Sequence, residues 1–165
     1  MGNFLNKAIF LDRDGTLNKD FGFVYKTEDL ALLPGVVEAL QLFQGRKYLL
    51  IVITNQSGVG RGFYTNRDVD TFNNELKKEL KKENIIIDDF YICMHSPDDN
   101  CECRKPSPYL INLAIIDHDI DPNQSYMFGD KQSDITCGKN ANIRSFLITK
   151  EHTLLYWAKK LESKL

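Results

Sequence analysis

The sequence predicts an α/β domain, a three-layer sandwich in which a central parallel sheet lies between two layers of helices. Five short apolar runs alternate with segments of helical periodicity along almost the whole chain. Such alternation is typical of βαβ units, whose crossovers place helices on both faces of a parallel sheet. The chain has 165 residues, of which 42% are hydrophobic, enough for one domain with a buried core. We therefore expect residues 1–165 to form a single domain without a large cap domain.

The first third of the chain contains two predicted strands and one predicted helix. Ala8–Leu11 is a continuous apolar run that ends at a turn containing Gly15 and Thr16, as expected of a buried strand. A Pro-Gly pair marks the start of the helical pattern of Gly35–Gln44. Leu49–Thr54 is the second apolar run and predicts a second strand of the same sheet.

The longest predicted helix covers Asn66–Glu83 and is followed by the third predicted strand, Phe90–Met94. Thr65 is a suitable N-cap for this helix, and Asp68 lies three residues later, as in a capping box. Lysine and glutamate residues interleave toward the end of the helix, which is typical of a solvated face rather than of a nucleic-acid-binding patch.

Two further βα units complete the predicted fold. A helix over Pro108–His118 leads to the fourth strand, Tyr126–Gly129, and a helix over Asp134–Asn140 leads to the fifth strand, Ser145–Ile148. An amphipathic helix over Glu151–Lys164 is expected to end the domain.

Composition narrows the environment and the partners of the protein. The net charge of −2 gives no global attraction to nucleic acid or to an anionic membrane. No apolar run reaches the roughly 18 residues that a membrane-spanning helix needs, and the first residues lack the apolar core of a signal peptide. We expect a cytoplasmic monomer that acts on a small molecule, and whose four cysteines are thiols or metal ligands rather than disulfides.

Two carboxylates, Asp12 and Asp14, directly follow the first predicted strand and precede a Gly-Thr turn. Side chains at the carboxyl end of a strand in an open α/β sheet point into the ligand crevice. There one carboxylate can bind Mg²⁺ and attack a phosphorus atom, while the other transfers a proton. A surface turn is the alternative for a bare Asp-x-Asp pair, but the complete string from the apolar run to Gly-Thr is far more specific.

Three later strand ends carry groups suited to the same chemistry. After the second strand, Thr54 offers a hydroxyl that can bind a phosphate oxygen. After the third strand, Lys105 offers a fixed positive charge for phosphoryl oxygens. After the fourth strand, Asp130 offers a hard oxygen ligand for Mg²⁺. Asp134 either orients Lys105 or a metal-bound water, or only begins a helix.

The order of these groups resembles the four motifs of the haloacid dehalogenase (HAD) phosphohydrolases, over nearly the whole chain. The resemblance implies a HAD-like Rossmannoid fold and phosphate-ester hydrolysis. It implies that Asp12 is the nucleophile, which becomes an aspartyl phosphate, and that Asp14 is the general acid and base. Thr54 and Lys105 would stabilise the transferred phosphoryl group. The Mg²⁺ ligands would be Asp12, the main-chain carbonyl of Asp14, and Asp130.

Two alternatives belong to other functional classes. A receiver domain of a signalling system also combines acidic residues with a phosphorylated Asp, a Thr and a Lys, but it does not account for the Asp-x-Asp-Gly-Thr string. A HAD scaffold that has lost catalysis and only binds a ligand is the second alternative, although every motif residue is present. Phosphate release from a panel of sugar phosphates in the presence of Mg²⁺ separates these possibilities.

A cluster of three cysteines and one histidine predicts a zinc site. Cys93, His95, Cys101 and Cys103 lie within eleven residues. Three thiolates and one imidazole form a closed tetrahedral Zn²⁺ shell, which leaves no position for a substrate or water. The zinc is therefore expected to be structural and to fix loop 93–103, which leads into the Arg-Lys pair of the active site.

Within the HAD enzymes, this zinc loop resembles two related groups. One is the histidinol-phosphate phosphatases of histidine biosynthesis. The other is the D-glycero-D-manno-heptose 1,7-bisphosphate 7-phosphatases, which make a precursor of the lipopolysaccharide inner core. Residues 20–24 resemble the D-x-G-Y-V segment of the heptose group, and residues 54–65 resemble its T-N-Q-S-G-h-x-R-G-h-h-T segment. The resemblance favours heptose bisphosphate as substrate, with histidinol phosphate as the alternative, and does not indicate the anomer.

The residues expected to contact the substrate lie in the loops that follow the strands, and they are Asp20, Gly22, Phe23, Asn55, Gln56, Ser57, Arg61, Arg104 and Lys131. Arg61 or Arg104 would meet the distal C1 phosphate, because a guanidinium group forks onto phosphate oxygens. A solvated loop position is the alternative for Arg61. Phe23 stands where the heptose group has Tyr, so a hydrogen bond from that hydroxyl is absent in this chain.

Overall fold

Five parallel strands form the centre of the protein, in the spatial order β3-β2-β1-β4-β5. The computed structural model describes residues 4 and 6–162. From β1 the chain first builds the sheet outward through β2 and β3, and it then returns to the other side of β1 to add β4 and β5. The strands are β1 (Lys7–Leu11), β2 (Tyr48–Asn55), β3 (Asp89–Cys93), β4 (Tyr126–Gly129) and β5 (Arg144–Leu147).

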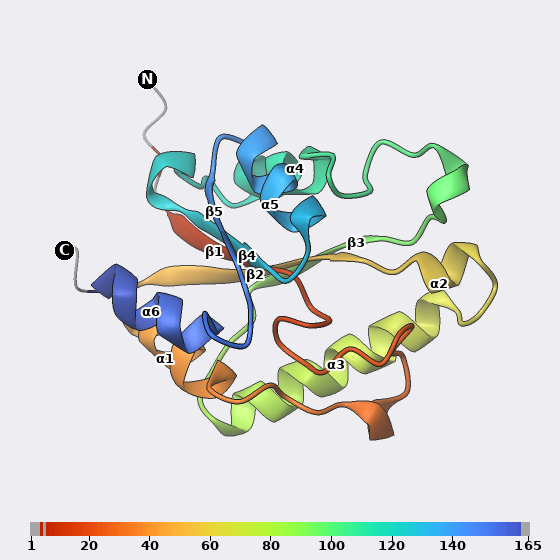
Figure 1. Ribbon diagram of the computed structural model, residues 1–165, viewed down its shortest axis with the longest axis horizontal. Helices are drawn as coiled ribbons and strands as arrows, with labels where there is room; N and C mark the ends of the chain where they lie inside the picture. The colour runs from red at the N-terminus through yellow and green to blue at the C-terminus, as the bar shows by residue number, and fades with distance from the viewer. Residues whose placement is uncertain (1–3, 5, 163–165) are drawn as a thin grey trace.

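Helices cover both faces of this sheet (Figure 1). One layer contains α1 (Val36–Gly45), α3 (Asn66–Lys82) and α6 (Leu154–Glu162), and the opposite layer contains α4 (Tyr109–Asp117) and α5 (Gln132–Asn140). A single turn, α2 (Ser57–Gly60), follows β2, and three 3-10 turns lie at Thr27–Asp29, Pro97–Asp99 and Pro122–Gln124.

The two faces of β1 show how the sequence divides the core. Ile9 and Leu11 pack with the layer of α1, α3 and α6, whereas Ala8 and Phe10 pack with the layer of α4 and α5. All four side chains are completely buried. A strand whose alternating side chains are apolar on both faces belongs at the centre of a covered parallel sheet, which is where β1 lies.

The predicted three-layer α/β fold is confirmed, and the differences lie at element ends. The last helix begins at Leu154 rather than Glu151, because Thr149 and His152 bond each other in a turn and Thr153 accepts a hydrogen bond from the N–H of Tyr156. Its predicted end at Lys164 lies outside the described residues. The helix after β4 begins two residues earlier than predicted, and α2 and the 3-10 turns were not predicted.

The carboxyl ends of β1 and β4 meet at the point where the strand order reverses, which is the place where open α/β sheets bind ligands. Between β1 and α1 the described chain contains only a loop and one 3-10 turn, so no large cap covers this edge. No helix in the described part of the chain is both long and apolar enough to cross a bilayer.

Candidate active site

A cavity of about 240 Å³ opens at the carboxyl edge of the sheet. Its walls come from the segments that follow β1, β2, β3 and β4, so residues far apart in the sequence meet there. The lining residues are Asp12, Asp14, Asp20, Gly22, Phe23, Asn55, Gln56, Ser57, Tyr64, Lys105, Lys131, Ser133 and Asp134. Most of the residues that the sequence predicts for the site therefore come together.

Lys105 lies at the bottom of this cavity between two carboxylates. Its Nζ is 2.8 Å from Oδ1 of Asp12 and 2.7 Å from Oδ1 of Asp134, and it also donates to the carbonyl of Ile53 at 2.7 Å. Lys105 is 4% exposed and Asp134 only 1%. Asp134 thus contacts Lys105 and also accepts a hydrogen bond from the Lys131 N–H at the start of α5, so it both orients Lys105 and begins a helix.

Burial and charge act together on these groups. Burial raises the pKa of Asp12 to about 7, with Lys105 acting in the opposite direction and Asp134 in the same one. Burial alone would lower the pKa of Lys105, but the carboxylates of Asp12 and Asp134 raise it above its ordinary value. Lys105 therefore stays charged and is a permanent cation beside the position of an incoming phosphate.

The backbone of Lys105 is fixed by the end of β2. The side chain of Asn55 accepts a hydrogen bond from the Lys105 N–H at 3.1 Å and donates to the Lys105 carbonyl at 3.4 Å. Asn55 was predicted as a substrate contact, and it does line the cavity, while its amide also pairs the end of β2 with the backbone of Lys105.

Asp14 is held by donors on both of its oxygens. Oδ1 accepts from Arg13 Nε at 2.9 Å and from Asn18 at 3.0 Å, while Oδ2 accepts from Arg13 Nη2 and from Gln56, both at 3.1 Å. The same amide nitrogen of Gln56 donates to the Thr54 hydroxyl at 2.9 Å. Gln56 is thus a buried link between Thr54 and Asp14.

A group of carboxylates at the bottom of the cavity and directly behind it has the chemistry of a divalent-cation site. Oxygen atoms of Asp12, Asp130 and Asp134 lie within 4.8 Å of one another. Oδ1 of Asp130 is buried without a hydrogen-bond partner among the described residues, and burial raises the pKa of Asp130. The ammonium of Lys105 pairs with Asp12 and Asp134, and that of Lys131 acts in the opposite direction to burial on the pKa of Asp130. An oxygen-rich, negatively charged cluster of this kind fits Mg²⁺.

Gly15 makes the approach of Asp130 possible. It has a φ of 80°, and a Cβ atom at this position would collide with the carboxylate of Asp130. Glycine is the one residue that combines this left-handed conformation with such a close contact. The Gly-Thr pair after Asp14 therefore serves the geometry of the carboxylate cluster as well as the turn.

Cys93, His95, Cys101 and Cys103 also converge on one point. The Sγ atoms of Cys93 and Cys101 are 3.6 Å apart, those of Cys101 and Cys103 are 3.8 Å apart, and His95 Nδ1 is 3.2 Å from Cys103. Zn–S bonds of about 2.3 Å in a tetrahedron place sulfur atoms about 3.8 Å apart. All four cysteines of the chain are free thiols, so this spacing fits a metal and not a disulfide.

The loops at the cavity mouth are joined by aromatic side chains. The rings of Phe23 and Phe63 meet edge to face at 4.9 Å, and the guanidinium of Arg61 lies 5.8 Å from the ring of Phe23. Across the mouth, Lys131 Nζ is 3.8 Å from Asp20. Arg61 and Arg104 are not among the residues that line the cavity itself, although Nη1 of Arg104 is buried without a partner among the described residues.

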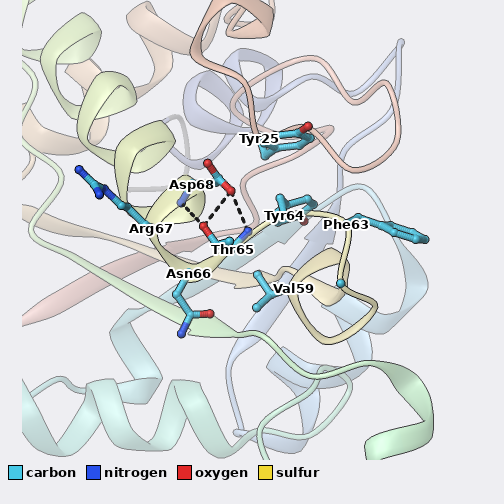
Figure 2. Close-up of a pocket in the computed structure, with 9 residues that line it drawn as sticks. Tyr25, Val59, Phe63, Tyr64, Thr65, Asn66, Arg67 and Asp68 are labelled. Atoms are coloured by element: carbon cyan, nitrogen blue, oxygen red, sulfur yellow. Dashed lines mark hydrogen bonds between the residues drawn. The ribbon is translucent and has the colours of Figure 1, made fainter.

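A larger hollow of about 700 Å³ lies beside the active-site cavity, at the start of α3 (Figure 2). Of its lining residues, only Tyr64 also lines the active-site cavity. Tyr25 stacks on Tyr64 at 4.7 Å, and the hydroxyl of Tyr64 donates to Gln56 at 2.8 Å. Thr65 and Asp68 bond each other as the predicted capping box of α3.

Three residues of the site were not predicted. Tyr64 and Ser133 line the cavity, and Arg13 contacts Asp14 from beneath it. Tyr64 lies within the segment that resembles the heptose group, which was a usable signal. The sequence around Arg13 contained no such signal, because a charged residue between two aspartates is expected to be exposed to solvent.

Comparison with known proteins agrees with this geometry. Residues 102–163 match the HAD-hydrolase-like family model. A D-glycero-β-D-manno-heptose-1,7-bisphosphate 7-phosphatase of Helicobacter pylori is 43% identical over 150 residues, which cover 90% of this chain and 87% of the relative. The chain belongs to the heptose-1,7-bisphosphate 7-phosphatase family. The predicted resemblance to the heptose group, rather than to the histidinol-phosphate group, is confirmed.

Other members of the family differ in the anomer that their names specify. A D-glycero-α-D-manno-heptose-1,7-bisphosphate 7-phosphatase of Campylobacter jejuni is 41% identical over 145 residues, covering 88% of this chain and 83% of the relative. Identity to an α-specific and a β-specific relative is thus nearly equal, so family membership does not indicate the anomer.

Solved structures confirm the HAD fold. The crystal structure of D,D-heptose 1,7-bisphosphate phosphatase from B. bronchiseptica, complexed with magnesium and phosphate, has a TM-score of 0.89 at 25% identity and covers 96% of this chain and 99% of that chain. A putative HAD-like phosphatase from Mesorhizobium loti has a TM-score of 0.82 at 28% identity, covering 86% and 72%.

Proposed function

We propose that this protein is a Mg²⁺-dependent phosphatase that removes the C7 phosphate of D-glycero-D-manno-heptose 1,7-bisphosphate, in the synthesis of the lipopolysaccharide core precursor. The observation that carries the proposal is the buried trio of Asp12, Lys105 and Asp134 beside Asp130, whose Oδ1 is buried without a hydrogen-bond partner among the described residues. This arrangement presents a carboxylate oxygen, a fixed cation and a divalent-cation site to one phosphate group, in a chain that belongs to the heptose bisphosphatase family.

In the first half-reaction, a carboxylate oxygen of Asp12 forms a bond to the phosphorus of the C7 phosphate while the bond from phosphorus to the C7 oxygen breaks. Asp14 donates a proton to the departing C7 oxygen. In the second half-reaction, a water molecule attacks the phosphorus of the aspartyl phosphate and gives its proton to Asp14. Asp12 is regenerated and inorganic phosphate is released.

Charge neutralisation supports both steps. In this proposal Lys105 and the Thr54 hydroxyl hold phosphoryl oxygens, which the contact of Asp134 with Lys105 supports. Asp12, Asp130 and the main-chain carbonyl of Asp14 would hold Mg²⁺, which when bound neutralises the charge of the phosphoryl group. Positioning and charge neutralisation are the main requirements of phosphoryl transfer, because its transition state is largely dissociative.

The sugar lies toward the cavity mouth in this proposal, because the phosphate occupies the bottom. Residues that line the cavity there contact the sugar in this proposal, and they are Asp20, Gly22, Phe23, Ser57 and Lys131. Arg61 or Arg104, which do not line the cavity, would bind the distal C1 phosphate outside it. A charge-assisted hydrogen bond contributes roughly 1.5–3 kcal/mol, so this contact favours a bisphosphate over a monophosphate by about tenfold to a hundredfold.

Catalytic efficiencies on heptose 1,7-bisphosphate and on histidinol phosphate test the substrate. We expect the bisphosphate to be preferred, and Arg61→Ala or Arg104→Ala to narrow its preference over a heptose monophosphate about tenfold or more. Arg67→Ala is the matched control, since Arg67 is an exposed arginine that lines the neighbouring hollow instead. More efficient turnover of histidinol phosphate would overturn the substrate, and an unchanged preference in both variants would overturn only the distal contact.

We propose that the second metal is a structural Zn²⁺ held by Cys93, His95, Cys101 and Cys103. The closed set of four ligands, two residues before Lys105, supports this role. Replacing Cys101 with Ser is expected to remove the zinc, to lower the melting temperature and to reduce turnover together, because metal binding contributes folding free energy. Elemental analysis should find about one zinc per wild-type chain.

The matched control for this prediction is Cys137→Ser. Cys137 is buried outside the cluster, where its thiol donates to the carbonyl of Ser107, a bond that a serine hydroxyl can replace. This variant should keep its zinc. A wild-type protein purified without zinc, or one in which Cys101→Ser leaves zinc content unchanged, would refute the assignment.

We further infer that the protein acts as a cytoplasmic monomer on a small-molecule substrate, without nucleic acid or membrane. The free thiols are in keeping with a reducing compartment, and the net charge of −2 gives no overall attraction to polyanions. Light scattering at micromolar concentration should give the mass of one chain, and a dimer mass would correct this inference.

A further inference from the structure

Arg13, the residue between the two aspartates of the site, is completely buried. Arginine is rarely buried in this way unless its guanidinium is paired and hydrogen-bonded. The mechanism described above does not use it. Its guanidinium contacts the carboxylate of Asp14 on one side, and Asn73 and Val24, which take no part in the reaction, on the other.

The guanidinium meets Asp14 as a fork. Nε donates to Oδ1 at 2.9 Å and Nη2 donates to Oδ2 at 3.1 Å, so both carboxylate oxygens are engaged by one planar group. Such a bidentate pair fixes the orientation of the carboxylate as well as its position. A lysine could not make the same two contacts from this position, because its ammonium is a single point donor.

The scaffold holds the guanidinium itself on three further sides. Nη1 donates to Oδ1 of Asn73 at 3.1 Å, and Nη2 donates to the carbonyl of Val24 at 2.7 Å. The ring of Phe72 lies 4.3 Å from the guanidinium carbon, within cation–π distance. Asn73 and Phe72 belong to α3, and Val24 belongs to the loop that lines the cavity mouth, so the fork is anchored to two separate elements.

We propose that Arg13 is a positioning residue that orients the carboxylate of Asp14 for proton transfer to and from the substrate oxygen. The inference rests on the proposed function, in which Asp14 protonates the leaving oxygen. Proton transfer requires heavy-atom distances of about 2.6–3.2 Å, and a misplacement of about 1 Å costs roughly a hundredfold in rate. Asn18 and Gln56 complete the cradle but are neutral single donors, so they cannot replace the fork.

A role in folding alone is the competing explanation, because a buried arginine with five contacts also stabilises the domain. The two explanations differ in how the effect depends on the leaving group. An alkoxide leaves poorly without a proton, whereas p-nitrophenolate leaves readily without one. If Arg13 acts through Asp14, replacing Arg13 must lower kcat/KM far more for a sugar phosphate than for p-nitrophenyl phosphate.

The test compares Arg13→Lys and Arg13→Met with the wild type, using kcat/KM because this quantity excludes hydrolysis of the aspartyl phosphate. We expect kcat/KM on heptose 1,7-bisphosphate to fall about tenfold to a hundredfold, and on p-nitrophenyl phosphate to fall less than about threefold. Asp14→Asn should show the same leaving-group pattern. Arg13→Lys keeps a buried cation for Asn73 and Val24, so it provides a folded variant if Arg13→Met is unstable.

A double-mutant cycle on the sugar phosphate alone gives the second measurement. In the Asp14→Asn background, the Arg13 changes should lower kcat/KM by less than about twofold, because the group that they position is already inactive. Equal losses on both substrates, together with a full additional loss in the Asp14→Asn background, would show that Arg13 only stabilises the fold. A wild-type protein that turns over no heptose bisphosphate would instead refute the proposed function.

Discussion

Replacing Asp12 with Asn is expected to lower turnover at least about a thousandfold, which corresponds to roughly 4 kcal/mol of activation free energy. Asn keeps the shape of the side chain and its contact distance to Lys105, but it removes the nucleophilic charge. The fold should survive, because the change removes a buried carboxylate whose pKa burial raises to about 7. Steady-state phosphate release from heptose bisphosphate measures the effect, with trapping of a phosphorylated chain as a second readout.

Asp70→Asn is the matched control for this change. Asp70 is exposed on α3 and lines neither of the hollows described above, so the same chemical change there should leave turnover within about twofold. Near-normal turnover in pure Asp12→Asn protein would remove Asp12 from the reaction, and with it the aspartyl-phosphate mechanism.

Replacing Lys105 with Met is expected to damage both stability and activity. Lys105 is the shared partner of Asp12 and Asp134, and all three side chains are buried. Removing one partner of a buried ion pair costs about 3–5 kcal/mol, because it leaves uncompensated charge in the interior. Loss of the fixed cation beside the phosphate should also reduce turnover about a hundredfold or more. Urea unfolding without added Mg²⁺ measures the first effect, and phosphate release in the presence of Mg²⁺ measures the second.

A compensating change separates charge repulsion from lost packing in this experiment. Asp134→Asn removes one of the two stranded carboxylates but can still accept the hydrogen bond from the Lys131 N–H, so adding it to Lys105→Met should restore part of the stability. Lys78→Met, at a side chain that is 73% exposed, should change stability by less than about 0.5 kcal/mol. If Lys105→Met lowered the free energy of unfolding by less than about 1 kcal/mol, the carboxylates of Asp12 and Asp134 would not depend on Lys105 for charge compensation.

The strands and the reacting residues could be predicted from the sequence because both depend on local patterns. The apolar run of β1 continues directly into Asp12, Thr54 lies at the end of β2 and Asp130 follows β4, and a parallel sheet brings such strand ends together without further information. Asp12, Lys105 and Asp130 therefore meet where the sequence predicted. The HAD resemblance then assigned them roles that geometry alone would have left open.

The supporting contacts could not be predicted because they depend on tertiary packing. Phe72 and Asn73 of α3 lie against the buried side chain of Arg13. Asn73 is sixty residues away from Arg13 in the chain. Gln56 resembles a substrate-binding residue in sequence, yet its amide lies between Thr54 and Asp14. The periodicity of α3 predicted a buried face, but it could not show that this face would contact the guanidinium of Arg13.

The separation between the reacting groups and the cavity mouth has a consequence for how this fold diversifies. The groups that act on phosphate follow the strand ends, whereas much of the mouth comes from two short segments, residues 20–23 and 57–64, with Lys131 opposite Asp20. Exchange of these two segments between relatives could change which sugar is accepted while the phosphate chemistry is inherited intact. Tyr64 is an exception, because it belongs to an exchangeable segment and is also linked to the catalytic groups. Its hydroxyl donates to Gln56, and Gln56 donates to Asp14. A grafted segment that lacks this tyrosine would import new specificity at the expense of the proton-transfer step.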